Sequence, residues 1–160
     1  MPLRNGKMKG ASFAVGAAEL IHSAYPGVRI NAFGNFPEKL VPDFIKYHFL
    51  PTDHKLIQLY RETSIFVLPS LIEGMSLPPL EAMACSCAIV STDCVGIRVY
   101  LRSEENSLIV KTGDSDEIFQ AVSRLIEDET LRQKLAKNGW ETSHLYTYEN
   151  MMREFISIMD

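Results

Sequence analysis

Residues 65–90 have the pattern of a strand, a loop, a helix and a second strand. The uninterrupted apolar run Ile65–Leu68 is typical of a strand that is buried on both faces of a parallel sheet. Pro78 and Pro79 suit the first turn of a helix, where backbone N–H groups have no intrahelical partner. The apolar run Ala88–Ser91 then predicts the next strand. This order of elements favours an α/β fold.

The same alternation runs along the rest of the chain. It predicts strands over residues 28–33, 44–50 and 107–110, and helices over residues 11–24, 53–61, 115–126, 131–144 and 149–158. Asp53 is predicted to cap its helix, with Leu56, Ile57 and Tyr60 facing inward. Residues 1–7 lack a strand pattern and are expected to form a loop. Residues 1–160 are therefore predicted to be one domain, with a Rossmann-like, doubly wound parallel sheet of about five strands and helices on both faces.

Composition excludes several other classes of protein. A net charge of −4 argues against a nucleic-acid partner, which requires a basic surface. No apolar run approaches the ~20 residues that span a bilayer. Three cysteines without a C-x-x-C spacing indicate neither disulfides nor zinc, and we expect small buried thiols in a reducing cytosol.

The loop between Leu68 and Pro78 combines two acids with a run of potential donors. Glu73 and Glu81 lie eight residues apart, at the carboxyl edge of the sheet, where ligands bind in open α/β folds. Between them, the backbone amides of Gly74, Met75, Ser76 and Leu77 lie at the positive end of a helix dipole and can hold an anion. The Ser76 hydroxyl would normally cap amides two or three residues ahead. Those residues are prolines, so this hydroxyl is expected to be available to a ligand.

The two acids and the amides are expected to bind different parts of the ligand. Because carboxylates repel a phosphate, Glu73 and Glu81 are expected to accept hydrogen bonds from neutral hydroxyl groups. A ligand with phosphate in its middle and hydroxyl groups at both ends fits this arrangement. A nucleotide-sugar is such a molecule.

The stretch from Phe66 to Ala84 resembles the E-x7-E signature of the retaining glycosyltransferases of family 4, which have the GT-B fold. The rest of the chain, from about Arg4 to Ile158, is similar to the C-terminal, donor-binding half of such enzymes. The resemblance implies that Glu81 binds the ribose, that Glu73 contacts the donor sugar, and that the backbone from Gly74 to Leu77 holds the diphosphate. It also implies that Arg4 and Lys9 neutralise the diphosphate.

The resemblance extends to the base and to the reaction. It places the base beside residues His48 to Thr52, and Arg98 and Tyr100 are further candidates to approach the site. The implied reaction moves a sugar from a nucleoside diphosphate to an acceptor hydroxyl, with retention at the anomeric carbon and with neither a metal nor a cofactor. The nucleotide-sugar donor is thus a substrate.

In similar enzymes an N-terminal acceptor-binding domain precedes this half, and we expect it to be missing here, so the chain alone should be inactive or nearly so. The implied location is the cytoplasm, with contact to the inner face of the membrane made through the missing half. Two alternatives remain open. One is a non-catalytic nucleotide-binding or regulatory module, and the other is a nucleotide-sugar epimerase of the same fold.

Overall fold

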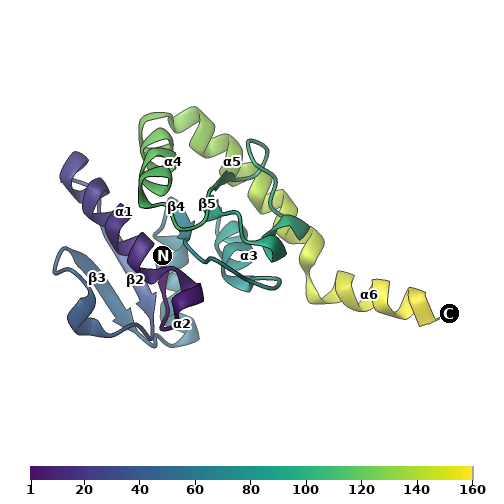
Figure 1. The fold of residues 1–160 in the computed structure, drawn as a ribbon. Helices are drawn as coiled ribbons and strands as arrows, with labels where there is room; N and C mark the ends of the chain where they lie inside the picture. Colours follow the sequence, from purple (N-terminus) through teal and green to yellow (C-terminus); the bar gives the residue numbers. More distant parts are fainter. Residues whose placement is uncertain (160) are drawn as a thin grey trace.

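The computed structural model describes residues 1–159, in which strands and helices alternate (Figure 1). The strands are β1 (Pro2–Leu3), β2 (Ile30–Gly34), β3 (Ile45–Phe49), β4 (Ile65–Leu68), β5 (Ala88–Thr92) and β6 (Leu108–Val110). The α-helices are α1 (Ala11–Ala24), α2 (Asp53–Arg61), α3 (Leu77–Ala84), α4 (Ser115–Glu127), α5 (Glu129–Ser143) and α6 (Tyr148–Met159). Short 3₁₀ turns are η1 (Lys7–Lys9), η2 (Glu38–Leu40), η3 (Val95–Val99) and η4 (His144–Tyr146).

The strands form two parallel sheets instead of one. Within residues 1–159, the first sheet has the order β1-β2-β3 and the second has the order β4-β5-β6. The predicted Rossmann-like α/β class is confirmed, but the prediction of a single sheet of about five strands is wrong. The expected loop at residues 1–7 also contains strand β1, in which Leu3 is fully buried.

Pro2 explains the break between the sheets. The carbonyl groups of Met1 and Leu3 face β2, where they accept hydrogen bonds from the amides of Phe33 (3.1 Å) and Phe36 (3.2 Å). Neighbouring residues of a strand direct their backbone groups to opposite edges, so Pro2 faces away from β2. Proline has no N–H group to donate to a further strand. Hydrogen-bonded pairing therefore ends at β1.

Alternate residues of the second sheet are buried on opposite faces. Phe66 and Leu68 of β4 pack in one cluster with α2 and α3, whereas Val67 packs in another with α1 and α4. In β5, Ile89 joins the first cluster and Val90 the second. This alternation confirms that helices cover both faces of the sheet.

The start of α1 lies directly against the end of β4. Gly10, the N-cap residue of α1, has a left-handed backbone conformation with φ of 65°. A Cβ atom at this position would lie 1.9 Å from the carbonyl oxygen of Pro69. Only glycine permits both this conformation and this close approach, so Gly10 fixes the distance between the loops that follow β1 and β4.

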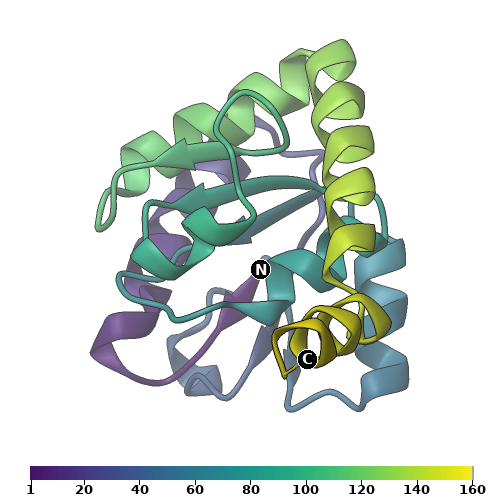
Figure 2. The same cartoon turned by 90° about the vertical axis from the view of Figure 1, so that its right-hand side faces the viewer.

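Helix α5 runs along one side of the domain, and α6 continues from its end (Figures 1 and 2). In Figure 1, α6 extends away from the rest of the molecule. None of the helices in residues 1–159 combines the length and the apolar character needed to cross a lipid bilayer.

Helix α3 ends in a Schellman motif that contains a strained serine. The amide of Ser86 donates to the Met83 carbonyl (2.9 Å), and that of Cys87 donates to the Ala82 carbonyl (3.0 Å). Ser86 has φ of 60°, in the left-handed region that glycine usually occupies at this position. A side chain in this conformation costs about 1–2 kcal/mol.

We predict that Ser86→Gly stabilises the protein, because glycine adopts this backbone conformation without steric strain. The expected gain is about 1 kcal/mol in the free energy of unfolding, or roughly 2–4 °C in Tm by calorimetry. Ala84→Gly, in the last turn of the same helix, is the matched control and should lower stability by about 0.5–1 kcal/mol. A lower Tm for Ser86→Gly would contradict this explanation.

We also predict that Gly10→Ala destabilises the protein by about 2–4 kcal/mol in urea denaturation, because strain and the clash with Pro69 add together. The control is Gly27→Ala, since a Cβ atom on Gly27 would meet nothing within 4 Å. The control should change stability by less than about 0.5 kcal/mol. Equal effects of the two substitutions would show that the contact at Gly10 is unimportant.

Candidate functional site

Two loops from different sheets are joined by backbone hydrogen bonds. The carbonyl of Met8, in the loop after β1, accepts from the amides of Leu71 (2.9 Å) and Ile72 (3.5 Å), in the loop after β4. Together with the contact at Gly10, these bonds place the predicted residues of the first loop beside those of the second.

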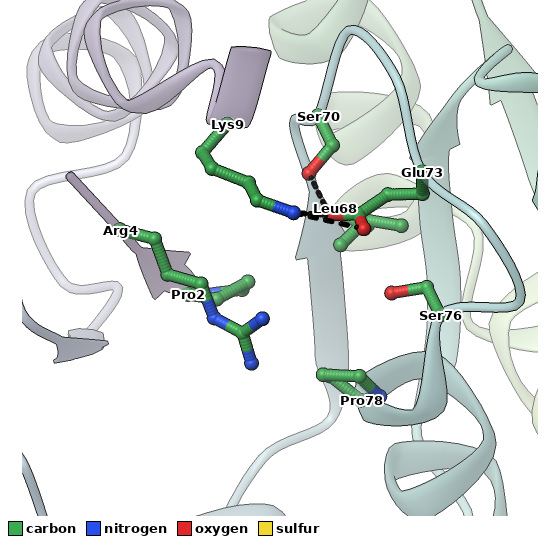
Figure 3. Close-up of a pocket in the computed structure, with 8 residues that line it drawn as sticks. All are labelled: Pro2, Arg4, Lys9, Leu68, Ser70, Glu73, Ser76 and Pro78. Carbon is green, nitrogen blue, oxygen red and sulfur yellow. Dashed lines mark hydrogen bonds and ion pairs between the residues drawn. The ribbon is translucent and has the colours of Figure 1, made fainter. Parts of the chain in front are cut away.

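A cluster of three side chains bridges the two loops (Figure 3). The Nζ atom of Lys9 lies 3.0 Å from both carboxylate oxygens of Glu73. The Ser70 hydroxyl donates to Oε1 of Glu73 at 2.7 Å. The Glu73 side chain is only 11% exposed, and that of Lys9 is 32% exposed. The carboxylate is therefore largely shielded from water and is compensated by a cation and a hydroxyl group.

This cluster lies in a narrow crevice, into which the Ser76 hydroxyl and the Arg4 side chain also project (Figure 3). Arg4 makes neither a hydrogen bond nor an ion pair with any residue that the structure describes. The crevice is closed around these side chains and has no room for a group the size of a water molecule, so a ligand would contact them from the open edge. The residues that line it are Pro2, Arg4, Lys9, Leu68, Ser70, Glu73, Ser76 and Pro78.

The start of α3 has the donor arrangement predicted from the sequence. Ser76 is the N-cap residue, and in the described part of the chain its side chain makes no capping hydrogen bond, because Pro78 and Pro79 occupy the positions that would donate to it. The amides of residues 74–77 likewise donate to no acceptor within residues 1–159. Four successive N–H groups and one hydroxyl are thus available at the positive end of the α3 dipole.

The loop that carries these amides packs against η3 and Tyr100. The amide of Gly96 donates to the carbonyl of Glu73 at 3.2 Å, and a Cβ atom on Gly96 would lie 2.1 Å from the carbonyl oxygen of Gly74. The hydroxyl of buried Tyr100 donates to the carbonyl of Ser76. Burial raises the pKa of Tyr100, so this hydroxyl stays protonated and remains a donor.

Glu81 lies outside the crevice and is held by a different residue. Its Oε2 atom accepts a hydrogen bond of 2.8 Å from the hydroxyl of Tyr60, which is buried at the end of α2. Glu81 itself is exposed to solvent. Its carboxylate is therefore accessible to a ligand but has one oxygen fixed by the protein.

The other predicted residues do not line the crevice. His48 is a half-buried residue of β3, and its Nε2 atom is buried with no partner among the described residues. Burial is the main cause that lowers the pKa of His48, and the cation of Lys55 adds to it. Thr52 is the N-cap residue of α2 and accepts from the amide of Lys55 at 3.4 Å. The prediction that Asp53 caps this helix is therefore wrong.

Of the two further candidates, Tyr100 contacts the loop that carries the amides of residues 74–77, whereas Arg98 forms an exposed ion pair with Asp93. Sequence reasoning missed Ser70 and the role of Tyr60. A sequence signal existed for both residues, since Ser70 lies two residues past the end of strand β4 and a buried tyrosine hydroxyl requires a partner. The described residues contain no group of three or more His, Cys, Asp or Glu side chains that could hold a metal ion.

Comparison with curated proteins identifies partial relatives. The chain is 34% identical over 113 residues to the N,N'-diacetylbacillosaminyl-diphospho-undecaprenol alpha-1,3-N-acetylgalactosaminyltransferase of Campylobacter jejuni. The match covers 71% of this chain but only 30% of that relative. The chain thus spans about a third of the length of this protein.

Two solved structures have a similar fold. The C-terminal domain of a glycosyl transferase group 1 family protein (LpcC) from Francisella tularensis matches with a TM-score of 0.80 and 26% identity, over 91% of this chain and 83% of that one. The Anabaena protein HepE in complex with UDP-glucose matches with a TM-score of 0.83, over 98% of this chain and 46% of that one. At 18% identity, the second likeness shows the fold alone. The family model "Glycosyl transferases group 1" matches residues 6–142, and the chain therefore belongs to this family.

Proposed function

We propose that this chain binds the donor of a retaining glycosyltransferase, a nucleoside-diphosphate sugar, along the carboxyl edge of its two sheets. The observation that carries the proposal is the meeting of Arg4, Lys9 and Glu73 beside the unpartnered amides at the start of α3. The crevice itself has no space of ligand size, so we assign the diphosphate and the adjoining sugar carbon to its open rim, beside Arg4, Lys9 and Glu73. The rest of the donor then lies along the open edge.

The diphosphate is proposed to bind between the two loops. The guanidinium of Arg4 has no competing partner among the described residues, and its planar fork suits phosphate oxygens. The Lys9 ammonium has three protons and its contacts to Glu73 use at most two of them, so at least one remains for a phosphate oxygen. The amides of residues 74–77 and the Ser76 hydroxyl complete the set of donors from the opposite side.

The two carboxylates are proposed to bind hydroxyl groups at either end of the diphosphate. Glu73 has lone pairs left after its bonds to Lys9 and Ser70, and the cation beside it reduces its repulsion of phosphate. We assign Glu73 to the donor sugar and Glu81 to the ribose. The resemblance in sequence supports a position for the base beside His48 and Thr52, which lie beyond the crevice.

In the proposed reaction, the bond between the anomeric carbon and the diphosphate breaks and a bond to the acceptor oxygen forms on the same face of the sugar. The leaving phosphate takes the proton of the acceptor hydroxyl. Arg4, Lys9 and the amides stabilise the charge that develops on the departing diphosphate. We propose that these groups perform the role that a divalent metal has in other enzymes. Retention and independence from metals rest on the resemblance to family 4.

The acceptor is proposed to bind to a separate, N-terminal domain. The match to only a third of the Campylobacter relative and the likeness to the C-terminal domain of the Francisella protein support this proposal. We propose that the enzyme acts in the cytoplasm, with contact to the inner face of the membrane made through the other domain.

Calorimetry with UDP, GDP and dTDP tests the binding site. We expect at least one of the three to bind, and we expect Glu81→Ala to weaken that binding roughly ten- to more than hundredfold, because a charged hydrogen bond to the ribose is lost. Glu19→Ala is the control, since Glu19 is an exposed residue of α1 and its loss changes the net charge equally. Failure of all three nucleotides to bind, or unchanged affinity in Glu81→Ala, would refute the assignment.

The 160-residue chain by itself is predicted to have negligible turnover, because the acceptor pocket is assigned to another domain. UDP or GDP released from UDP-glucose or GDP-mannose, in the presence of simple glycoside acceptors, should not exceed the release in a blank without protein. A full-length relative serves as the positive control. Robust release of the nucleotide and formation of glycosylated product by the chain alone would contradict this prediction.

A further inference from the structure

The contact between Tyr60 and Glu81 joins a buried group to an exposed one. Tyr60, in the last turn of α2, is 3% exposed, whereas Glu81, on α3, faces solvent. The phenol oxygen lies 2.8 Å from Oε2 of Glu81, within hydrogen-bond range. A long acidic side chain on an exposed helix surface would otherwise be free to change its rotamer.

The position of the Tyr60 hydroxyl is fixed by the packing of its ring. The ring of Phe33 meets it edge-on at a centroid distance of 5.8 Å, and the ring of Phe66 lies at the same distance on a tilted plane. These two rings come from strands of different sheets, β2 and β4. The hydroxyl is therefore anchored to the framework of the domain.

The Tyr60 hydroxyl is also a permanent donor. Burial raises the pKa of Tyr60, and the neighbouring Glu81 carboxylate raises it further. The charge of Arg4 acts in the opposite direction with a smaller effect.

We propose that Tyr60 is a positioning residue that fixes the Glu81 carboxylate in the orientation required to accept hydrogen bonds from the two hydroxyl groups of a ribose. A carboxylate offers about four lone pairs, and the bond from Tyr60 uses one of them. Because Glu81 is exposed, the remaining lone pairs are accessible to a ligand. This inference rests on the proposed function and adds to it a residue that touches no substrate.

The fixed carboxylate has a defined consequence for binding. A free glutamate loses its rotamer freedom when a ligand binds, which weakens the affinity. A glutamate already held by Tyr60 loses less. The benefit applies only to ligands that have the ribose hydroxyl groups, and so it changes selectivity as well as affinity.

The test compares the 160-residue chain with its Tyr60→Phe variant by calorimetry. The probes are UDP and GDP, each beside its 2′,3′-dideoxy counterpart. In the unaltered chain, the ribonucleotide should bind more tightly than the dideoxy form. In Tyr60→Phe this preference should shrink about three- to tenfold, while affinity for the dideoxy form stays within about twofold. Adding Tyr60→Phe to Glu81→Ala should cause little further loss of affinity, because Tyr60 acts through the carboxylate that Glu81→Ala removes.

Tyr25→Phe is the matched control. The Tyr25 hydroxyl also donates to a glutamate, Glu127, but it lies just past the far end of α1 from the crevice. This variant removes the same kind of bond and should leave the preference for ribose unchanged. Thermal melts of all variants report any loss of folding.

Each result gives a decision. Equal weakening of ribo and dideoxy ligands by Tyr60→Phe would mean that the tyrosine only supports the fold, and unaltered preference would mean that it does not orient Glu81. In both cases the proposed donor site would stand and the positioning role would fall. If neither UDP nor GDP binds to the unaltered chain, the role of Tyr60 in holding a ribose fails, and if dTDP also does not bind, the proposed function fails with it.

Discussion

The contact between the start of α1 and the end of β4 determines where the charged groups of the site lie. Gly10 lets the two segments approach to a distance that no other residue permits, and the Met8 carbonyl joins the same loops through the amides of Leu71 and Ile72. Lys9 lies between these two contacts, so its ammonium is brought to Glu73, 64 residues away in the sequence. This junction therefore places both loops at the same crevice.

The charges in this crevice favour an anion. Glu73 and Lys9 neutralise each other, which leaves the positive charge of Arg4 in excess. The unpartnered amides at the start of α3 add the positive end of a helix dipole. The Glu73 carboxylate does not cancel this positive charge, because it is already paired with Lys9 and accepts a hydrogen bond from Ser70. A ligand with both phosphate and hydroxyl groups would complement these charges and the two carboxylates.

Local patterns in the sequence were sufficient for most of the framework. The bounds of α1 follow from its apolar spacing and from the Tyr25-Pro26-Gly27 stop, and β4 follows from its four apolar residues. Strand β1 was not predicted, because its two residues are too short for any pattern and its burial depends on β2 and α1. In α2, Tyr60 and Leu56 pack inward as predicted, but Ile57 is 46% exposed and Leu59 is buried, so the prediction was wrong for Ile57. The packing of Tyr60 between Phe33 and Phe66 determines which face of α2 is turned towards the core.

For the site, the sequence indicated which residue types were present, but not how they pair. The prolines after Ser76 predicted its uncapped hydroxyl correctly, since the cause lies within three residues. The pairing of Lys9 with Glu73 and that of Tyr60 with Glu81 connect distant segments, and no local pattern contains that information.

The break in hydrogen bonding beside Pro2 has a mechanical consequence. Arg4 follows a strand of the first sheet, whereas Ser76 and Glu73 follow a strand of the second. A molecule bound by both loops would connect the two sheets where their hydrogen bonding is interrupted. The domain would then be most rigid with its ligand bound, and the contact between the sheets would respond directly to binding.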